Sequence, residues 1–399
     1  MGGTMKASKL NTQLSQIQES ATVALADRVR KLIADGQPVV ALQTGDPDFS
    51  TPEPIIEAGY RAIKEGLTHY ANSRGLPELR EAIAQKIKTD NDGVYSPTTE
   101  ILVTNGGVHS YYCAIKAIAN PGDEIIIPDP AWMTHVNTVA MLGCVPITAP
   151  SYAENDFWPS LTDIERRITP KTKAIVINSP NNPTGAVASH DYLANVVELA
   201  KRHDVYVISD EVYEYIIYDG LKHVSIASFR NEYDKIIIIN SFSKSYAMTG
   251  WRIGYMAAPG EVISHALKAS QNTITNVAAF IQKAALCALT DPQVKPIVQQ
   301  MYAQYEKRRN NALQILKAEN TRIDVFIPKG AFYLFIDIHN LGLDSLTLAE
   351  RLLSEAKVSM VPGSVYGKCG EGYLRMTLAA SSDSIERGVR GLSKWVLHI

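Results

Sequence analysis

The sequence has few cysteines, and they lie far apart. Its 399 residues include only four, Cys113, Cys144, Cys287 and Cys369. Their spacing forms neither the CxxC pairs of many zinc and redox sites nor the dense disulfide framework of a small secreted domain. We therefore expect reduced thiols, a cytoplasmic protein and no metal site.

Long apolar runs and an excess of either charge are also absent. No run approaches the roughly 18 to 20 apolar residues that a membrane-spanning helix needs. The 39 lysines and arginines nearly balance the 41 aspartates and glutamates, so we expect neither nucleic acid nor an anionic membrane as a partner. Residues 1–6 begin like a myristoylation signal, but Lys6 stands where serine or threonine is required. No apolar segment follows, and we predict a frayed tail there.

Two phosphate-binding motifs are missing as well. No GxGxxG follows a predicted strand, which argues against a nicotinamide-dependent dehydrogenase. The segment 363–369 looks like a P-loop, but it is one residue short and ends in Cys369 rather than serine or threonine. We predict an ordinary loop at this position.

Chain length and an alternating pattern predict the architecture. A chain of 399 residues exceeds what one compact core usually holds, so we expect a large and a smaller domain. From residue 100 onward, short apolar runs alternate with polar turns and helical patterns, as in a parallel sheet with crossover helices. The predicted strands of this sheet span 101–104, 124–127, 145–148, 174–177, 205–209, 236–240 and 253–257.

The remaining segments complete an α/β prediction. Helices are expected at 21–35, 54–65, 77–89, 261–271, 274–289 and 294–317, and a short strand at 39–42. Beyond them, strands are expected at 323–327, 331–338, 358–361 and 372–378, and helices at 346–356 and 383–397. We predict a large domain at 51–292, whose mostly parallel sheet is flanked by helices. A smaller α/β domain would be built from both chain ends, 1–50 and 293–399.

Lys244 stands just beyond the predicted strand at 236–240. The apolar residues of that strand would be buried on both faces of a parallel sheet. A lysine at the mouth of such a strand would be partly desolvated, which lowers its pKa and makes the amine a nucleophile able to form a Schiff base. The alternative, for an isolated Ser-x-Ser-Lys sequence, is a solvated loop lysine.

Other predicted strands also end in residues suited to binding a ligand. In open parallel sheets, ligands bind outside the carboxyl ends of the strands. Gly106 and Gly107 follow one strand and open a helix, whose exposed amides could cradle a phosphate. Asp210 ends another strand, and a carboxylate buried there needs a cationic partner.

Three further features have an ordinary structural explanation besides a functional one. Trp132 follows a predicted strand, although tryptophans more often belong to the core. The string NSPNNPTG at 178–185 also follows a strand, and its residues are common in turns. Arg375 lies within the predicted strand at 372–378, where it either pairs with an anion or extends to solvent.

Together these segments resemble the class I/II aminotransferases, which depend on pyridoxal phosphate. Within that family the resemblance is to the aspartate aminotransferase-like enzymes of fold type I. The segment 241–254 is similar to the lysine motif of that family, and Asn-Pro-Thr-Gly at 182–185 matches its signature. The resemblance covers roughly residues 20–395. It implies a pyridoxal 5′-phosphate cofactor and amino-group transfer between an L-amino acid and a 2-oxo acid.

The resemblance also implies roles for single residues. Lys244 would hold the cofactor as a Schiff base and act as the base, Asp210 would face the pyridine nitrogen, and Tyr213 would hydrogen-bond the ring oxygen. Glu211 is the alternative carboxylate. The cofactor-binding residues would be Gly106, Gly107, Val108, Trp132, Asn182, Asp210, Tyr213, Ser241, Ser243, Lys244, Arg252 and Tyr70. The substrate-binding residues would be Gly45, Trp132, Asn182 and Arg375, the last of which suits a forked contact with the substrate α-carboxylate.

Tyr70 carries the prediction about assembly. The segment 70–80 matches a family motif whose tyrosine reaches the cofactor phosphate of the partner subunit. This implies a homodimer with shared active sites. The alternative is a loop tyrosine that packs its ring and exposes its hydroxyl.

The sequence departs from the family at positions that bear on substrate choice. Some aspartate-using members have a lysine directly after the Gly-Gly pair, where this chain has Val108 followed by His109. Ala131 replaces a usual aromatic residue, and with Tyr111 it could accommodate a larger side chain. We therefore hypothesise a broad donor preference that includes neutral or aromatic amino acids. His109, if charged and directed inward, would instead restore acidic substrates near or below about pH 6.5.

Two other functions stay open at this point. A pyridoxal phosphate lyase or synthase would share the cofactor contacts, so spacing alone does not exclude it. A non-enzymatic regulator would need a DNA-binding domain, and the roughly 50 residues before the first motif offer neither the room nor the basic charge.

Overall fold

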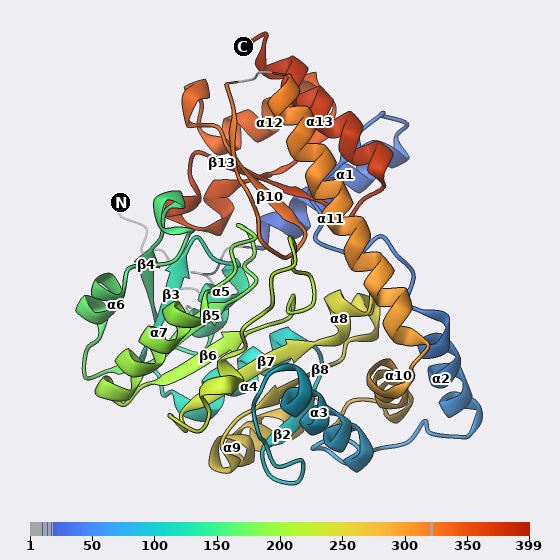
Figure 1. Ribbon diagram of the computed structural model, residues 1–399, viewed down its shortest axis with the longest axis vertical. Helices are drawn as coiled ribbons and strands as arrows, with labels where there is room; N and C mark the ends of the chain where they lie inside the picture. Colours follow the sequence, from blue (N-terminus) through green and yellow to red (C-terminus); the bar gives the residue numbers. More distant parts are fainter. Residues whose placement is uncertain (1–9, 11–13, 15–16, 18, 320–321) are drawn as a thin grey trace, which may run out of the picture.

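The computed structural model describes residues 10, 14, 17, 19–319 and 322–399, and Figure 1 shows how they are arranged. The tail predicted at residues 1–6 lies outside the described residues. A large sheet forms the lower part of the view and a smaller sheet lies above it. The long helix α11 (Val294–Ala318) runs between the two levels.

The large sheet has seven strands in the order β2-β8-β7-β6-β5-β3-β4. Its strands are β2 (Ile101–Thr104), β3 (Glu124–Asp129), β4 (Val145–Pro150), β5 (Thr172–Asn178), β6 (Tyr206–Asp210), β7 (Ile236–Ser241) and β8 (Gly254–Ala257). The pairs β3–β4, β3–β5, β5–β6 and β6–β7 are parallel, whereas β8 runs antiparallel to both of its neighbours. The prediction of a mostly parallel sheet is therefore confirmed.

Both faces of this sheet are buried. In β7, Ile236 and Ile238 pack into one core cluster, while Ile237 and Ile239 pack into another. Successive side chains of a strand point to opposite faces, so a strand covered on both sides needs apolar residues at every position. This explains the unbroken run of isoleucine that precedes Ser241.

Helices cover the sheet and lie beside it in Figure 1. They are α2 (Glu53–Lys64), α3 (Pro77–Asp90), α4 (Gly107–Ile118), α5 (Met133–Met141), α6 (Leu161–Arg167), α7 (His190–His203), α9 (Gly260–Gln271) and α10 (Ala279–Thr290). The helix predicted at 274–289 begins only at Ala279. Thr275 has a φ of 66°, a left-handed conformation that an α-helix does not continue through.

The smaller sheet is antiparallel, and a separate two-stranded pair joins the N-terminal segment to the C-terminal part of the chain. The smaller sheet has the order β12-β13-β10-β9, and the separate pair, β1 with β11, is parallel. The elements are β1 (Val40–Ala41), β9 (Asp324–Phe326), β10 (Tyr333–Asp337), β11 (Val358–Ser359), β12 (Val361–Pro362), β13 (Tyr373–Thr377), α1 (Ala21–Ala34), α12 (Ser345–Glu355) and α13 (Ser382–Val396). The domain boundaries expected after residues 50 and 292 stay a prediction.

The segment that resembles a P-loop forms two short 3-10 turns, Gly363–Tyr366 and Lys368–Gly370. The backbone amides of Lys368 and Cys369 donate to the carboxylate of Asp129, at 3.2 and 3.1 Å. These amides therefore hold an anionic side chain of the protein itself, at the end of β3.

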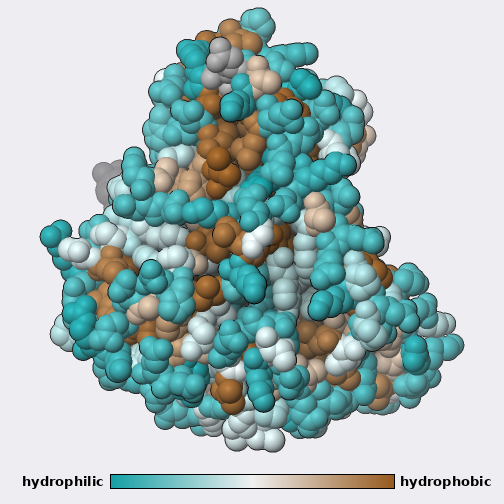
Figure 2. All heavy atoms as spheres, in the orientation of Figure 1, coloured by the Kyte–Doolittle hydropathy of each residue, from teal (hydrophilic) through white to brown (hydrophobic). Residues whose placement is uncertain are grey.

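Figure 2 shows a largely hydrophilic face on which apolar residues form several separate groups, one over the upper part and another where the upper and lower parts meet. Among the described residues, no helix is both long and apolar enough to cross a membrane.

Candidate active site

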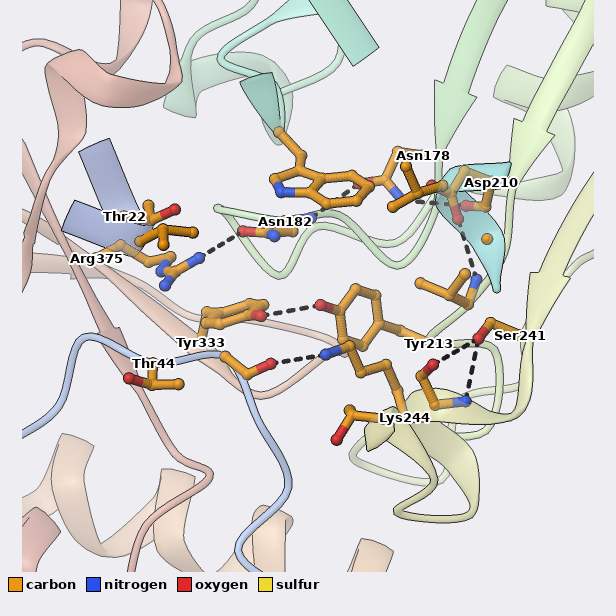
Figure 3. A pocket seen from close by; sticks show the side chains of 18 of the residues that line it. Thr22, Thr44, Asn178, Asn182, Asp210, Tyr213, Ser241, Lys244, Tyr333 and Arg375 are labelled. Atoms are coloured by element: carbon orange, nitrogen blue, oxygen red, sulfur yellow. Dashed lines mark hydrogen bonds between the residues drawn. The ribbon is translucent and has the colours of Figure 1, made fainter. Parts of the chain in front are cut away.

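A cavity of about 450 Å³ lies at the carboxyl ends of β5, β6 and β7, where α1 and the start of α4 also reach it (Figure 3). The predicted site residues that line it are Gly45, Gly107, Val108, Trp132, Asn182, Asp210, Tyr213, Ser241, Ser243, Lys244, Arg252 and Arg375. Gly106 and Tyr70 are the predicted residues that are not among its lining. The structure thus gathers most of the predicted set around one space.

Lys244 lies in α8 (Phe242–Ser245), a single helical turn directly after β7. The Ser241 hydroxyl accepts a hydrogen bond from the Ser243 amide at 3.0 Å, which fixes the start of this turn. The Lys244 ammonium donates to the Gly45 carbonyl at 2.7 Å. The pKa of Lys244 is lowered from 10.5 to about 8, mainly because the amine is buried; Asp46 opposes this shift, and the positive charges of Arg375 and Arg252 add to it. An amine with this pKa is a competent nucleophile near neutral pH.

Asp210 marks one end of the cavity (Figure 3). Its carboxylate pairs with Nε2 of His135 at 2.9 Å and accepts a hydrogen bond from the Val212 amide at 3.3 Å. The side chain of His135 is 1% exposed, and its ring packs against Trp132 with centroids 5.4 Å apart. No local pattern marks His135 as a site residue, because its contact with Asp210 joins positions 75 residues apart.

Hydroxyl groups and a guanidinium lie together where a phosphate was expected. Ser241 Oγ donates to Ser243 Oγ at 2.8 Å. Arg252 approaches Gly106 so closely that a Cβ atom on that glycine would lie 2.8 Å from Arg252 Nη2, and Gly106 also has a φ of 82°. Only glycine suits this position, since the backbone is left-handed and the space is taken. The arrangement places a cation beside the start of α4.

Arg375 marks the other end of the cavity (Figure 3). Its guanidinium donates to the Asn182 side-chain oxygen at 3.0 Å and to the Gln43 carbonyl at 2.6 Å, and the residue is 4% exposed. Among the described residues no carboxylate pairs with it, and its Nε has no hydrogen-bond partner. A buried cation without a counter-charge is strongly unfavourable, so this end of the cavity is suited to an anion.

Two tyrosines meet in the middle of the cavity. The hydroxyl groups of Tyr213 and Tyr333 are 2.9 Å apart, and the Arg375 guanidinium lies 4.3 Å from the centroid of the Tyr333 ring. Burial raises the pKa of both hydroxyls, so each stays protonated and able to donate a hydrogen bond. Glycine is the only residue type that fits at position 45, since a Cβ atom on Gly45 would lie 2.1 Å from the Tyr333 hydroxyl oxygen.

Sequence reasoning missed part of the cavity. The lining residues that it did not select are Thr22, Val23, Ala26, Arg30, Gln43, Thr44, Asn178, Val212, Thr249 and Tyr333. Four of them belong to α1, a helix that was predicted but not placed near the site. The helical pattern of that segment carried no indication of what its exposed face contacts.

Several residues considered for substrate choice lie outside the lining. His109 Nδ1 accepts a hydrogen bond from the Asn105 amide at 3.2 Å, and its Nε2 contacts the Thr273 hydroxyl at 3.0 Å. Burial lowers the pKa of His109, which disfavours its charged form. The idea that a charged His109 enters the site is therefore wrong. Ala131 and Tyr111 are buried at 5% and 1% exposure and are not among the cavity residues either.

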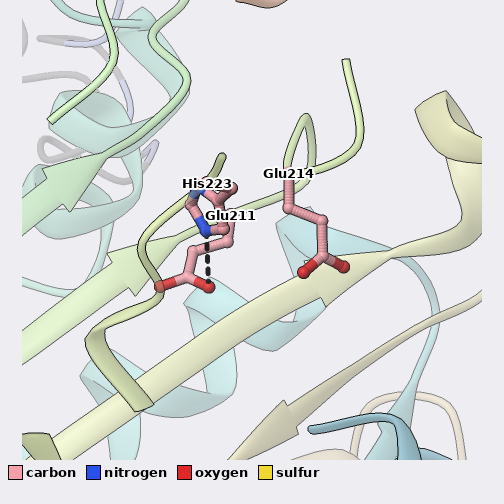
Figure 4. A group of neighbouring side chains, drawn as sticks. All are labelled: Glu211, Glu214 and His223. Atoms are coloured by element: carbon pink, nitrogen blue, oxygen red, sulfur yellow. Dashed lines mark hydrogen bonds and ion pairs between the residues drawn. The ribbon is translucent and has the colours of Figure 1, made fainter. Parts of the chain in front are cut away.

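Glu211 belongs to a separate buried cluster with Glu214 and His223 (Figure 4). The Glu211 carboxylate pairs with His223 Nε2 at 3.1 Å and accepts hydrogen bonds from Ser209 Oγ and the Ile226 amide. Glu214 forms an ion pair with Lys86. These oxygens already have partners from the protein itself, so we interpret the group as a structural network. Of the two neighbouring carboxylates, Asp210 is the one that lines the cavity.

Comparisons with known proteins agree with this geometry. A family described as aminotransferase class I and II matches residues 37–392. The chain is 41% identical over 390 residues to a probable aspartate/prephenate aminotransferase of Aquifex aeolicus, which covers 96% of this chain and 98% of that protein. It is 39% identical over 383 residues to aromatic-amino-acid aminotransferase 2 of Thermococcus litoralis, which covers 93% of this chain and 98% of that protein. The structure of aspartate aminotransferase from Thermus thermophilus with maleate matches with a TM-score of 0.92 at 37% identity, over 97% of this chain and 99% of that chain.

Proposed function

The chain belongs to the aminotransferase class I and II family, and on this premise we propose that it transfers amino groups with pyridoxal 5′-phosphate and accepts a broad range of donors. Amino-group transfer and the fold type I architecture follow from the family. The lyase and regulator alternatives are not supported, because the relatives that match nearly the whole chain are named aminotransferases.

One observation carries the proposal. The amine of Lys244, whose pKa is lowered to about 8, faces a cavity that has a buried carboxylate, Asp210, at one end and an unpaired guanidinium, Arg375, at the other. An amino acid with an α-carboxylate and a reactive amine complements this arrangement. The carboxylate would supply the counter-charge that Arg375 lacks.

The residues of the cavity would contact four parts of the cofactor: its phosphate, its pyridine nitrogen, its ring face and its ring oxygen. Ser241, Ser243, Arg252 and the amides that open α4 would hold the phosphate, and the missing Cβ of Gly106 leaves room for the Arg252 guanidinium beside them. Asp210, held by His135, would face the pyridine nitrogen. Trp132 would cover the ring, and Asn182 and Tyr213 would donate to the ring oxygen.

When bound, the cofactor supplies an electron sink that stabilises negative charge at the substrate Cα. Arg375 and the Gly45 backbone would fix the substrate carboxylate, which orients the Cα–H bond toward Lys244. Lys244 would then take the proton from the substrate Cα, and the lowered pKa keeps a useful fraction of the amine unprotonated near neutral pH. Asp210 would stabilise positive charge on the pyridine nitrogen throughout.

Assembly and location are also part of the proposal. Tyr70 is 89% exposed and does not line the cavity of its own chain, which supports a role at the site of a neighbouring chain in a homodimer. All four cysteines are free, which supports a reducing, cytoplasmic environment.

Val108 bears on the range of amino donors. This residue lines the cavity and offers no charge where some aspartate-using relatives have lysine. The chain is similar in sequence to relatives named for aspartate, prephenate and aromatic amino acids. This supports a donor range that includes acidic and aromatic substrates.

Two experiments test the proposal. Borohydride reduction of the purified protein should fix pyridoxal 5′-phosphate to Lys244, as peptide mapping would show, and recovery of the label on another lysine would overturn the assignment. A panel of aspartate, glutamate, phenylalanine, methionine and alanine, each with 2-oxoglutarate and pyruvate, measures the donor range. Turnover of aspartate and glutamate alone would contradict the broad preference.

A further inference from the structure

Helix α1 presents one face to the cavity. Thr22, Val23, Ala26 and Arg30 line it, and these positions span an arc of about 100° around a helix that turns about 100° per residue. Figure 3 places Thr22 at the Arg375 end of the cavity, away from Asp210. Arg28 lies on roughly the opposite side of the same helix and forms an ion pair with Glu350 at 3.8 Å.

Arg30 is the cation of the cavity that has no assigned role. Among the described residues that line the cavity, the lysines and arginines are Lys244, Arg252, Arg375 and Arg30. The proposed function uses the first three for the cofactor aldehyde, the cofactor phosphate and the substrate α-carboxylate. A dicarboxylic substrate would bring one more negative charge into the cavity, and a second carboxylate there needs a cationic partner.

The present partner of Arg30 leaves it available. Its guanidinium pairs with Asp27 one turn away on α1, and the two side chains are 74% and 61% exposed. Exposed pairs of this kind contribute little stability, because water competes with both charges. Arg30 can therefore exchange Asp27 for a substrate carboxylate, and it can stay with Asp27 when the substrate side chain is neutral.

We propose that Arg30 of α1 is the residue that binds the distal carboxylate of acidic substrates, a role that rests on the proposed function and replaces the lysine missing at Val108. A planar, forked guanidinium suits a carboxylate, and a long side chain on a helix at the cavity edge can move toward or away from it. This arrangement allows one cavity to accept both acidic and neutral donors.

Ligand binding provides a test that does not depend on turnover. The probes are succinate and butyrate, two four-carbon acids that differ by one carboxylate, titrated into the cofactor-loaded protein with an absorption or calorimetric readout. We expect Arg30→Gln to weaken succinate binding about tenfold, the low end for a charge-assisted hydrogen bond, and to change butyrate binding by less than about twofold. Arg30→Lys should recover part of the loss, because it restores the charge but not the fork.

Kinetics provide the second readout. For the half-reaction with aspartate, kcat/KM should fall about tenfold in Arg30→Gln, while the value for phenylalanine stays within about twofold. Arg28→Gln is the matched control, since it removes the same charge from the same helix on the face turned away from the cavity. It should leave both donors within about twofold.

The outcomes separate this inference from the proposed function. If Arg30→Gln weakens the binding of succinate and butyrate equally, or lowers kcat/KM equally for aspartate and phenylalanine, Arg30 has only a structural role and its assignment is overturned. The assignment is also overturned if Arg30→Gln changes neither binding nor kcat/KM, or if Arg28→Gln changes them in the same way. If the unaltered protein transfers the amino group of none of the amino acids, the proposed function fails. The comparison of succinate with butyrate then still decides whether Arg30 binds a second carboxylate.

Discussion

The buried ion pair between Lys86 of α3 and Glu214 offers a quantitative test of how the region behind the candidate site is stabilised. The two side chains are 7% and 4% exposed. Lys86 also donates to Asn91 Oδ1 at 2.7 Å, and Glu214 accepts hydrogen bonds from Asn91 and Asn240 at 2.9 and 2.6 Å. Asn240 in turn accepts from the Ser241 amide at 2.7 Å. The pair therefore supports the strand end that carries the expected phosphate site.

The perturbation is Glu214→Gln, which keeps the shape of the side chain and removes its charge. It leaves the Lys86 ammonium buried without a counter-charge, a change that typically costs about 3 to 5 kcal/mol. We expect about 3 kcal/mol, because the glutamine oxygen can still accept a hydrogen bond. For 399 residues the entropy of unfolding is about 0.8 kcal/mol per kelvin, so the loss corresponds to a fall in Tm of about 4 °C.

The assay is thermal unfolding followed by circular dichroism, with Glu78→Gln as the control. Glu78 pairs with Lys283 at 2.7 Å, but their side chains are 41% and 34% exposed, so the control should lose less than about 1 kcal/mol. Adding Lys86→Met to Glu214→Gln should recover stability, because it removes the stranded charge. Equal Tm values for Glu214→Gln and the control, or a double variant less stable than Glu214→Gln, would refute the reasoning.

Three other predictions concern the candidate site itself. Labelling of cofactor-free protein with a small amine-reactive reagent should show a midpoint near pH 8 for Lys244, since burial lowers its pKa to about 8; a midpoint near that of surface lysines would contradict it. Mixing Tyr70→Phe chains with Lys244→Ala chains should produce more activity than either alone if sites are shared, and no gain after proven subunit exchange would exclude sharing. His109→Gln should leave the ratio of kcat/KM for aspartate to kcat/KM for phenylalanine unchanged at about pH 6 to 9, because burial lowers the pKa of His109. A change in this ratio confined to low pH would show that His109 contributes charge.

Much of the fold could be predicted because its signals are local. The apolar run before Ser241 indicates a buried parallel strand from composition alone, and the observed β7 spans Ile236–Ser241. Gly106 and Lys244 could be selected because each follows such a strand by a few residues. These positions depend on short stretches of chain, and the topology of a parallel sheet brings the strand ends to one edge.

Contacts that depend on packing between distant segments could not be predicted in this way. His135 meets Asp210, and Tyr333 meets Tyr213, only because separate elements pack together, and neither pair has a spacing that sequence periodicity could reveal. The position of α1 over the cavity has the same cause. Its amphipathic pattern indicates a helix with one contacting face, but not which surface that face contacts.

The charges around Lys244 also link the binding of a substrate carboxylate and of a phosphate to the proton affinity of the lysine amine. After burial, the main influences on the pKa of Lys244 are Asp46, which raises it, and Arg375 and Arg252, which lower it. A substrate carboxylate on Arg375 and a phosphate on Arg252 would each neutralise one of those cations, so both ligands would raise the proton affinity of the amine. Added phosphate and butyrate should accordingly move the labelling midpoint of Lys244 upward in cofactor-free protein, and an unchanged or lower midpoint would contradict this coupling. The lysine would then be a weak proton acceptor in the empty site and a stronger one once the anions are in place, which is when a proton must be taken from the substrate Cα.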